Sequence, residues 1–478
     1  MGLLNFFKTS QKKAKKRYYG ATNGNLFSTW QTVNYTADEL IKKDLKALRA
    51  RARELVRNNS HATKYIRLLQ QNIIGNGIRL QNKAKDANGS YDKFANDAIE
   101  SKWKEFCEKG NCEVTQSLDM VEICKLIISS VATDGEVLIR KVRKYKNSHK
   151  FALQIIEADH LDEQFNDHTK NIVMGIEKDK YGRPVAYHLF KYNPNDIQNI
   201  NRERVRVPAD EIIHLYRKDR PSQSRGVSWF APVMADLKMY DGFAEAALVE
   251  KRLTASKMGF YKKPQGEEYY GDDVDADGNV INEATPGQFE ILPEGWDFES
   301  FDPKSGNDNF VDFGKAILRN IASGLGVSYN SLANDLEGVN YSSIRAGLID
   351  ERDGYKSLQT WIIEHFMKPV FTDWLEMQLL TQNIKLPFAK FDKFNQPLFI
   401  PRSFAWVDPL RDNQANALAI KEGLKTATQV ASEQGADIEE LYQQLSYEKE
   451  LRKKYGIITA SDAEIIQNGG GNETQAAV

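Results

Sequence analysis

The chain has 478 residues, a length that predicts two or more compact units or one elaborate fold. Its 65 Lys and Arg nearly balance 66 Asp and Glu, for a formal net charge of −1, which excludes a chain that clamps nucleic acid over its whole surface, because tight phosphate binding requires many cations. The mean hydropathy is −0.55 and no apolar run approaches the roughly 18 residues of a bilayer span, so we expect a soluble protein without membrane contact.

The first 39 residues predict a flexible basic arm. Residues 8–17 contain six cations and no acid, and a connector rich in Gly, Asn, Ser and Thr follows to about residue 36. Charge alone leaves two interpretations open, a solvated tail or a contact with DNA or an acidic partner.

Helices and then strands are predicted up to about residue 227. One helix is expected from Ala37 to about Asn58, with Leu40, Leu45, Leu48 and Leu55 facing inward. A second contains Tyr65 and Ile74 and is closed by Gly75 and Gly77, and helical stretches follow near Trp103 and from Ile123 to Val131. Four strands are expected, at Val137–Val142, Phe151–Ile156, Ile172–Ile176 and Val185–Phe190. This order of elements is typical of an α+β domain.

The polar residues of this domain form no recognised catalytic motif. The carboxylates and imidazoles that could act as acids, bases or ligands are Glu136, Glu157, Asp159, His160, His188 and His214. None stands at a known spacing, and the sequence lacks HExxH, GxSxG and GxxxxGK(S/T) patterns. The three cysteines, Cys107, Cys112 and Cys124, have no CxxC spacing and are expected to be reduced thiols. We expect no catalytic residue, no resident metal and no cofactor.

A long helix is predicted from Ser228 to Met258, with Pro232 near its first turn. Its basic positions are Lys238, Lys251, Arg252 and Lys257. An acidic, turn-rich insert follows from Tyr261 to Pro303, with short strands expected near Phe260–Lys262, Gln288–Leu292 and Trp296–Phe298. Its residues Asp273, Asp275 and Asp277 resemble the start of a calcium loop, but the twelfth position is Ala284 where a bidentate acid is needed. An acidic surface turn is the preferred interpretation, and a calcium site is the weaker alternative.

The rest of the chain is organised around residues 316–378. Ile317, Ile321 and Leu325 predict a helix that ends near Gly326, and a polar loop is expected from Tyr329 to Ser343. A long helix then follows, with Asn340, Ser342 or Ser343 as its cap, and Pro369 should kink it. Its apolar stripe contains Ile344, Leu348, Tyr355, Leu358, Ile362, Phe366, Val370, Trp374 and Met377. An irregular return to residue 409, short helices over 410–465 and a disordered tail over 466–478 complete the prediction.

Several stretches resemble portal proteins of lambda-type tailed bacteriophages. The words GLGVSYNSL (324–332) and NYSSIRAG (340–347) resemble the family's signature, and Asp335 lies between them. Further segments that resemble this family occur at 48–81, 134–140, 153–162, 175–190, 220–248 and 406–456. They follow the family's order over roughly residues 40–460.

The resemblance implies an architecture. Residues 40–227 would form the wing, 228–260 and 306–327 two stem helices, 261–305 the clip, 328–342 the tunnel loop, 343–409 the long helix and its return, and 410–465 the crown. The tunnel loop would place Asn334, Asp335, Leu336, Glu337, Gly338, Val339, Asn340 and Tyr341 at the DNA channel. The stem cations Lys238, Lys251, Arg252 and Lys257 would face it, and Leu248 and Ile362 would contact neighbouring subunits.

The resemblance also implies a function and partners. Portal proteins form a ring, commonly of about twelve copies, at one capsid vertex, through which double-stranded DNA enters and leaves without sequence specificity. Expected partners are further copies of the chain, terminase, the head–tail connector, and the major capsid and scaffold proteins. The protein would be assembled in the host bacterial cytoplasm and reside in the virion.

The sequence leaves two other classes of function open. One is a DNA-binding enzyme such as a nuclease, whose basic arm would recruit substrate, although no acidic metal triad stands at a known spacing. The other is a monomeric calcium-dependent adhesion module built on Asp273, Asp275 and Asp277. A very large particle in solution would distinguish a ring from both.

Overall fold

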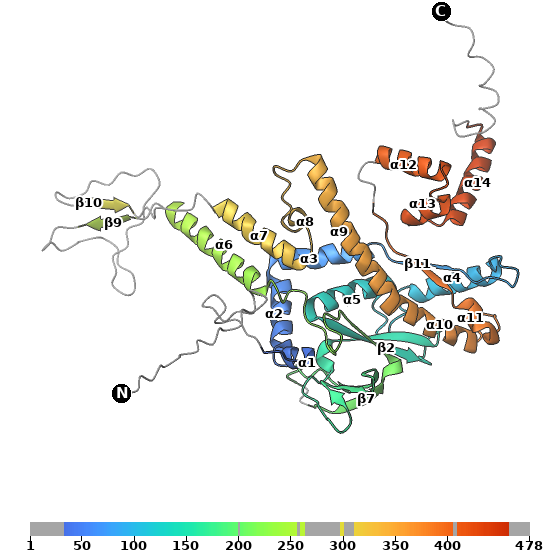
Figure 1. Ribbon diagram of the computed structural model, residues 1–478, viewed down its shortest axis with the longest axis horizontal. Helices are drawn as coiled ribbons and strands as arrows, with labels where there is room; N and C mark the ends of the chain where they lie inside the picture. The colour runs from blue at the N-terminus through green and yellow to red at the C-terminus, as the bar shows by residue number, and fades with distance from the viewer. Residues whose placement is uncertain are drawn as a thin grey trace, which may run out of the picture.

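The computed structural model describes residues 33–198, 201–255, 259–262, 297–300, 310–404 and 409–457. Figure 1 shows a central body of helices and small sheets, a pair of helices that projects from one side of it, and a group of helices beside it near the C-terminus. This mixture of helices and separate small sheets confirms the α+β class predicted from the sequence. No helix in the described ranges is both long enough and apolar enough to cross a bilayer.

The first predicted helix is two helices. α1 (Ala37–Ile41) is capped by Thr36, and α2 (Leu45–Asn58) begins after a three-residue turn. The break has a physical cause, because Asp38 accepts a hydrogen bond of 2.8 Å from the backbone N–H of Ser224 and ties α1 to a loop of the body. The prediction that Leu40 faces inward was therefore wrong, since its side chain is exposed, whereas Leu45 and Leu55 are buried.

Three further helices frame the body. α3 (Ser60–Leu69) runs into a π-helical segment, η3 (Gln70–Ile74), which ends at Gly75 as predicted. α4 (Lys93–Cys107) and α5 (Met120–Asp134) match the helical stretches expected near Trp103 and Ile123. α5 ends at Gly135, which has a φ of 91°, and a side chain there would meet the backbone of Val227 at 2.5 Å. This close approach brings the segment before the projecting helices against the body.

Two antiparallel sheets complete the first part of the body. One has the order β3-β2-β8 and contains β2 (Glu136–Arg143), β3 (Phe151–Ile156) and β8 (Ile212–Tyr216). The other has the order β4-β5-β6-β7 and contains β4 (Ile172–Val173), β5 (Ile176–Lys178), β6 (Pro184–Phe190) and β7 (Arg204–Pro208). The strand predicted at 172–176 is split, because Met174 and Gly175 adopt positive φ angles of 47° and 81°. The other three predicted strands are confirmed, and β7 and β8 were missed.

The projecting pair is α6 (Met234–Ala255) and α7 (Phe310–Leu325). α6 leads away from the body and α7 leads back to it (Figure 1). Between them, β9 (Gly259–Lys262) pairs antiparallel with β10 (Asp297–Ser300). α6 begins six residues later than predicted, because Ser228 and Trp229 donate hydrogen bonds to the carbonyl of Ala132 and hold residues 229–233 in turns on the body.

The long helix is continuous but changes its winding. α9 (Tyr341–Ile362) passes into a π-helical segment, η7 (Ile363–Met367), and then α10 (Lys368–Leu380). Pro369 is in the first turn of α10. Proline has no N–H to donate to the preceding turn and its ring crowds the carbonyl there, so the backbone widens just before it. The sequence predicted a kink at Pro369; the structure has a π segment directly before this residue, and the kink itself stays a prediction.

The C-terminal part of the chain first returns to the body and then leads away from it. The return passes through η8 (Phe388–Lys390) and α11 (Phe391–Phe394) to β11 (Pro397–Ile400), which pairs with β1 (Arg79–Asn82). α12 (Pro409–Lys421), α13 (Ala427–Glu433) and α14 (Ile438–Tyr455) then confirm the short helices predicted from residue 410.

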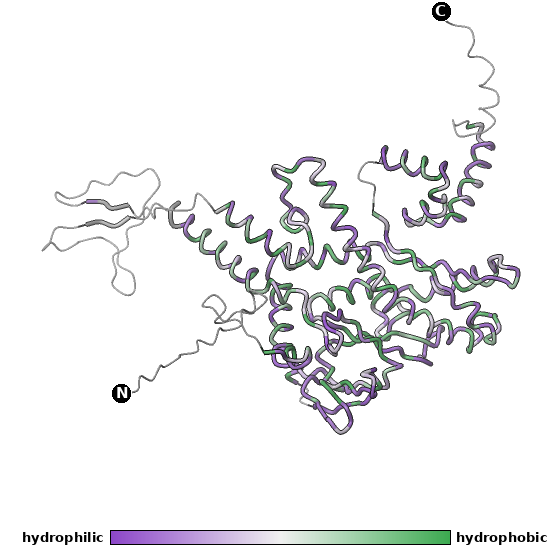
Figure 2. The backbone as a smooth tube through the Cα atoms, in the orientation of Figure 1, coloured by the Kyte–Doolittle hydropathy of each residue, from purple (hydrophilic) through white to green (hydrophobic). Residues whose placement is uncertain are grey.

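The main core lies where α3, α4, α5 and α10 meet. Its centre is a cluster of aromatic rings, with Trp103 and Trp374 in edge contact at 5.0 Å between ring centroids. Figure 2 shows that apolar positions gather in this body, while the helices near the C-terminus alternate between apolar and polar. α12 and α14 contain no buried residue. The C-terminal half of the long helix is thus fixed in the core, and its N-terminal half extends toward the loop described next.

Candidate functional site

The loop before the long helix is shorter than the sequence predicted. α8 (Tyr329–Ala333), capped by Ser328, occupies the first third of the expected loop, so the irregular part is residues 334–340. A single turn of helix forms here because the Ser328 side chain accepts a hydrogen bond from the N–H of Ser331 and Leu332 is buried. The loop starts at Asn334, which is left-handed with a φ of 54°. It ends at Asn340, whose side chain accepts from the N–H of Ser343 and caps α9.

The acidic residues of the loop are held by a lysine of the returning helix. Lys315 of α7 contacts Glu337 at 2.9 Å and Asp335 at 3.4 Å. One carboxylate oxygen of Asp335 also accepts a hydrogen bond from the Tyr329 hydroxyl at 2.7 Å, and the other accepts one from the backbone N–H of Glu337 at 2.9 Å. The loop is therefore tied to α7, and its charge is partly balanced within the chain.

These contacts shift the acid–base behaviour of the loop. The hydrogen bonds from Tyr329 and from the Glu337 N–H, together with Lys315, lower the pKa of Asp335. The hydrogen bond to Glu337 leads the contacts that raise the pKa of Lys315. Both groups are accordingly charged at neutral pH.

The tip of the loop is exposed and has a turn in its backbone. Leu336 is 62% exposed there. Gly338 has a φ of 68°, so its position requires a residue that tolerates left-handed geometry.

A second group of hydrogen bonds fixes the base of the loop. Glu351 of α9 accepts from Ser328 and Ser331 through one oxygen, each at 2.8 Å, and from the Tyr355 hydroxyl through the other at 2.8 Å. α8 is thereby attached to α9. Sequence reasoning found Asp335, Glu337 and Asn340 but missed Lys315 and Glu351, because only the folding of α7 and α8 brings these side chains to the loop.

The cations of α6 do not form one group. Lys238 pairs with Glu54 of α2 at 3.6 Å, and Lys251 and Arg252 are exposed further along the helix. Lys257 lies outside the described residues, as do Asp273, Asp275 and Asp277, and the side chain of Tyr341 is likewise not described. Whether any of these residues faces a channel stays a prediction.

The two residues expected at subunit contacts differ. Leu248 of α6 is 56% exposed, so it is available to a neighbour. Ile362 is fully buried in its own chain, among the core residues that surround α10. Its proposed place at an interface was wrong, because the apolar stripe of the long helix turns into the body at this point.

Three of the polar candidates in the α+β domain come together in a buried ionic cluster. Glu136 of β2 contacts Arg225, His214 at 3.0 Å and Arg49 at 3.2 Å. Burial opposes the charge of Glu136, but Arg225 and His214 outweigh it and lower the pKa of this carboxyl. Asp159 joins through Arg49 at 3.0 Å. Each acid has a cation, and the cluster connects α2, β2, β8 and the segment before α6, which is a structural role.

The other candidates lie apart from this cluster. Glu157 accepts a hydrogen bond from Asn193, the Nδ1 atom of His160 lies 2.9 Å from the carbonyl of Phe190, and His188 lies 3.4 Å from Glu177. Among the described residues there is no group of three or more His, Cys, Asp or Glu that could hold a metal ion. The three cysteines are free thiols, and burial raises the pKa of each.

The structure thus combines a projecting helix pair, a short acidic loop and a long helix with a π segment. The family model described as phage portal protein, lambda family, matches residues 23–359. The chain therefore belongs to the lambda family of phage portal proteins.

Two relatives illustrate the extent of the similarity. A probable portal protein of Halomonas phage phiHAP-1 is 37% identical over 448 residues, which cover 91% of this chain and 86% of the relative. Portal protein B of Escherichia phage lambda is 22% identical over 487 residues, covering 92% of this chain and 90% of the relative. A chain in the neck of a native gene transfer agent (GTA) particle matches 82% of this chain and 94% of its own length, with 13% identity and a TM-score of 0.47.

Proposed function

We propose that copies of this chain form a closed ring at one vertex of a phage capsid, and that double-stranded DNA passes through its centre during packaging and ejection. Membership of the lambda portal family is the observation that carries the proposal. We propose the wing, stem, clip and crown with the boundaries that the resemblance implies, and residues 334–340, the irregular part of the loop, as the tunnel loop.

Exposed apolar residues on the projecting helices support ring assembly. Met239, Leu248 and Val249 of α6 and Val311 and Phe313 of α7 are large and exposed. A helix pair that projects from its body with this much apolar surface gains stability when neighbouring copies cover it. The absence of buried residues in α12 and α14 supports the same arrangement for the crown.

The loop residues fit a channel through which DNA slides. Asp335 and Glu337 carry the same charge as phosphate, so they disfavour tight contact with DNA. Lys315 keeps them attached to α7. The exposed Leu336 at the tip presents an apolar, uncharged surface. Such a loop narrows a channel without creating a deep electrostatic well, which DNA could leave only slowly.

The proposed role is not enzymatic and requires no cofactor. Its partners are terminase, a head–tail connector and the major capsid and scaffold proteins, and the site of action is the virion vertex after assembly in the host cytoplasm. The acidic clip is proposed as the terminase contact. No observation in the described residues favours the nuclease or the calcium-dependent adhesion module.

Substitution of Leu248 by Asp tests the ring. A carboxylate placed in a subunit contact costs several kcal/mol when it is desolvated without a partner, so the Leu248→Asp chain is expected to elute as monomers while the parent gives rings of about twelve copies. Light scattering after gel filtration and negative-stain images measure this. Phe94→Asp, at a residue 75% exposed on α4, is the control. A Leu248→Asp chain that forms rings as the parent does contradicts the proposed contact.

A further inference from the structure

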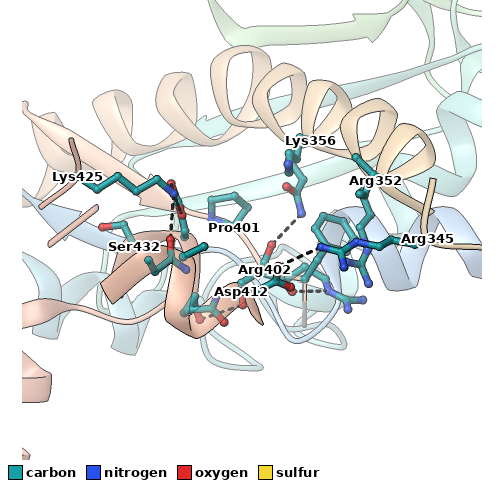
Figure 3. A pocket seen from close by; sticks show the side chains of 16 residues that line it. Arg345, Arg352, Lys356, Pro401, Arg402, Asp412, Lys425 and Ser432 are labelled. Atoms are coloured by element: carbon teal, nitrogen blue, oxygen red, sulfur yellow. Dashed lines mark hydrogen bonds and ion pairs between the residues drawn. The ribbon is translucent and has the colours of Figure 1, made fainter. Parts of the chain in front are cut away.

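A cleft of about 520 Å³ lies between the long helix and the C-terminal helices. One wall is α9, another is the chain at 401–404, and the third consists of α12 and α13 (Figure 3). Most of the residues that line it are polar, and its cations are Arg345, Arg352, Lys356, Arg402 and Lys425. Only two carboxylates, Asp412 and Glu433, share it. The cleft therefore has an excess of positive charge in a chain whose net charge is close to zero.

The cations on α9 form a row. Arg345, Arg352 and Lys356 are separated by seven and four residues, a spacing that puts side chains on one face of a helix. The row extends over eleven residues, or about 17 Å at the rise of an α-helix. One strand of duplex DNA advances about 3.4 Å per phosphate along the axis, so the row matches roughly five nucleotides of one strand. A small anion would need one compact cradle rather than a row of this length.

An aromatic ring orients two of the arginines. The guanidinium carbons of Arg352 and Arg402 lie 5.4 and 5.2 Å from the centre of the Phe404 ring, and Tyr355 stacks on the same ring at 6.4 Å. Guanidinium groups packed on an aromatic face keep their N–H donors directed away from the ring. Less side-chain entropy is then lost when Arg352 binds a phosphate, whereas Arg402 already donates hydrogen bonds to the backbone carbonyls of Gln71 and Ser403.

The two carboxylates in the cleft hold cations that an anion could take over. Arg345 pairs with Asp412 at 3.3 Å, with both side chains about a third exposed, and Lys425 pairs with Glu433 at 2.8 Å. Lys356 pairs with Asp353, and both are well exposed to solvent. Solvent-exposed pairs of this kind contribute only about 0–1 kcal/mol. A polyanion can therefore compete for these cations at small cost.

We propose that this cleft binds the phosphate backbone of DNA, with the row on α9 contacting successive phosphates of one strand. The choice of DNA as the ligand depends on the proposed function, whereas the preference for phosphate depends on the cleft alone. The site is separate from the tunnel loop, whose own residues are acidic. Contacts are to the backbone, because Arg and Lys in a row carry no pattern that would distinguish base sequences.

A salt titration tests the site with a charge-matched control. We compare parent rings with the variant Arg352→Gln/Lys356→Gln/Lys425→Gln and with Lys170→Gln/Lys180→Gln/Lys385→Gln, which removes three cations from outside the cleft. A fluorescent 20-base-pair duplex is the probe. Each lost phosphate contact reduces the slope of log affinity against log salt by about 0.9. We expect the cleft variant to lose about two to three in slope and at least about tenfold in affinity near 0.1 M salt. A cleft variant that matches its control overturns the proposal.

Lysine acetylation read by mass spectrometry tests the same site without substitutions. DNA is expected to slow the acetylation of Lys356 and Lys425 several-fold and to leave Lys385 unchanged, while a poly-glutamate peptide protects neither. Equal protection by the peptide would mean that the cleft takes an acidic protein segment, and protection before any ligand is added would mean that a neighbouring copy covers it; either result overturns the proposal. The reaction is carried out on whatever assembly the chain forms. Absence of rings would thus contradict the proposed function alone.

Discussion

Glu100 is a partly buried carboxylate, and burial disfavours its charged form. It lies on α4, accepts a hydrogen bond of 2.6 Å from the backbone N–H of Asn82, and burial raises its pKa to about 7, with Asp437 and Asp97 adding to the effect. A raised pKa means that the folded state favours the protonated form. The stability from this group is thus fully present below about pH 4.5 and is lost as the pH rises through about 7.

Glu100→Gln should remove this pH dependence. The amide keeps the acceptor for Asn82 but carries no charge, so we expect the variant to be more stable than the parent by roughly 1 kcal/mol at pH 8, after allowing for solvent screening, and unchanged at pH 4.5. Thermal unfolding at both pH values measures the difference. Glu105→Gln on the same helix is the control, since a hydrogen bond from Lys102 lowers the pKa of Glu105. Equal stabilisation at both pH values would exclude burial of charge as the cause.

Local patterns predict single residues only where the partner is near in sequence. Asn340 was recognisable as a helix cap because a cap bonds to an N–H three residues away. Lys315 contacts Glu337 from 22 residues upstream, and Arg225 contacts Glu136 across 89 residues. The sequence contains no local mark of either contact. Charged residues could be found, but their partners depended on the fold.

At the scale of elements, the tunnel loop gives the first prediction. In the ring, Asp335→Lys/Glu337→Lys should leave assembly intact but slow DNA translocation, because two added cations attract phosphate and repel Lys315, which releases the loop from α7. The slowing should be largest at low salt, where screening is weakest. Packaging rate against salt measures it.

A matched substitution separates charge from attachment. Lys315→Gln breaks the contacts with Asp335 and Glu337 without adding a cation. We expect its translocation rate to depend on salt much less than that of the double variant. A double variant that translocates at the parent rate at all salt concentrations would place the loop away from DNA.

Ile362 gives the second prediction at this scale. A carboxylate at this fully buried position has no cation to pair with, so Ile362→Asp should destabilise the chain itself by at least about 3 kcal/mol. Circular dichroism during heating is the measurement, with Leu248→Asp as the comparison, since that exposed site should leave the unfolding of the monomer unchanged. If Ile362→Asp melted like the parent, the packing of the C-terminal end of α9 in the core would be in error.

Helices with strong apolar spacing were predictable, and their exact ends were not. Ile321 and Leu325, or Val370 and Trp374, recur at helical steps, so α7 and α10 could be predicted from the sequence. α6 starts late because Trp229 bonds to Ala132, and α1 separates from α2 because Asp38 bonds to Ser224. β7 was missed because Arg204 and Arg206 alternate with only two valines and give little apolar signal.

At the scale of the whole molecule, the clip can be tested by deletion. Residues 270–285 lie outside the described ranges, in the acidic insert between α6 and α7. Because the insert joins the far ends of two projecting helices, its removal should preserve rings and abolish terminase binding. A pull-down with purified terminase, alongside negative-stain images of the deleted chain, gives the answer. Undiminished binding would assign the terminase contact to another surface.

The family and its α+β fold class could be predicted because the segments that resemble portal proteins follow the family's order along the chain, from 48–81 to 406–456. The interface could not. An apolar stripe on a helix has the same sequence pattern whether its own chain or another copy covers it. The sequence therefore assigned Ile362 to a subunit contact although it is buried in its own chain, whereas Leu248 is exposed and remains a candidate for such a contact.

The long helix also has the mechanics of a lever. Its α10 end is anchored, since Trp374 is fully buried and Asp373 contacts Lys141 at 2.7 Å and Arg143 at 2.8 Å. The inner end of α9 is also fixed, because Tyr355 and Gln359 are buried and Gln359 donates hydrogen bonds to the carbonyls of Asn72 and Arg402. The arm beyond them, residues 341–354, is about 21 Å long, so a rotation of roughly 8° would displace the loop end by about 3 Å. That displacement is comparable to the separation of Lys315 and Glu337. A rotation of this size is therefore enough to make or break the attachment of the loop.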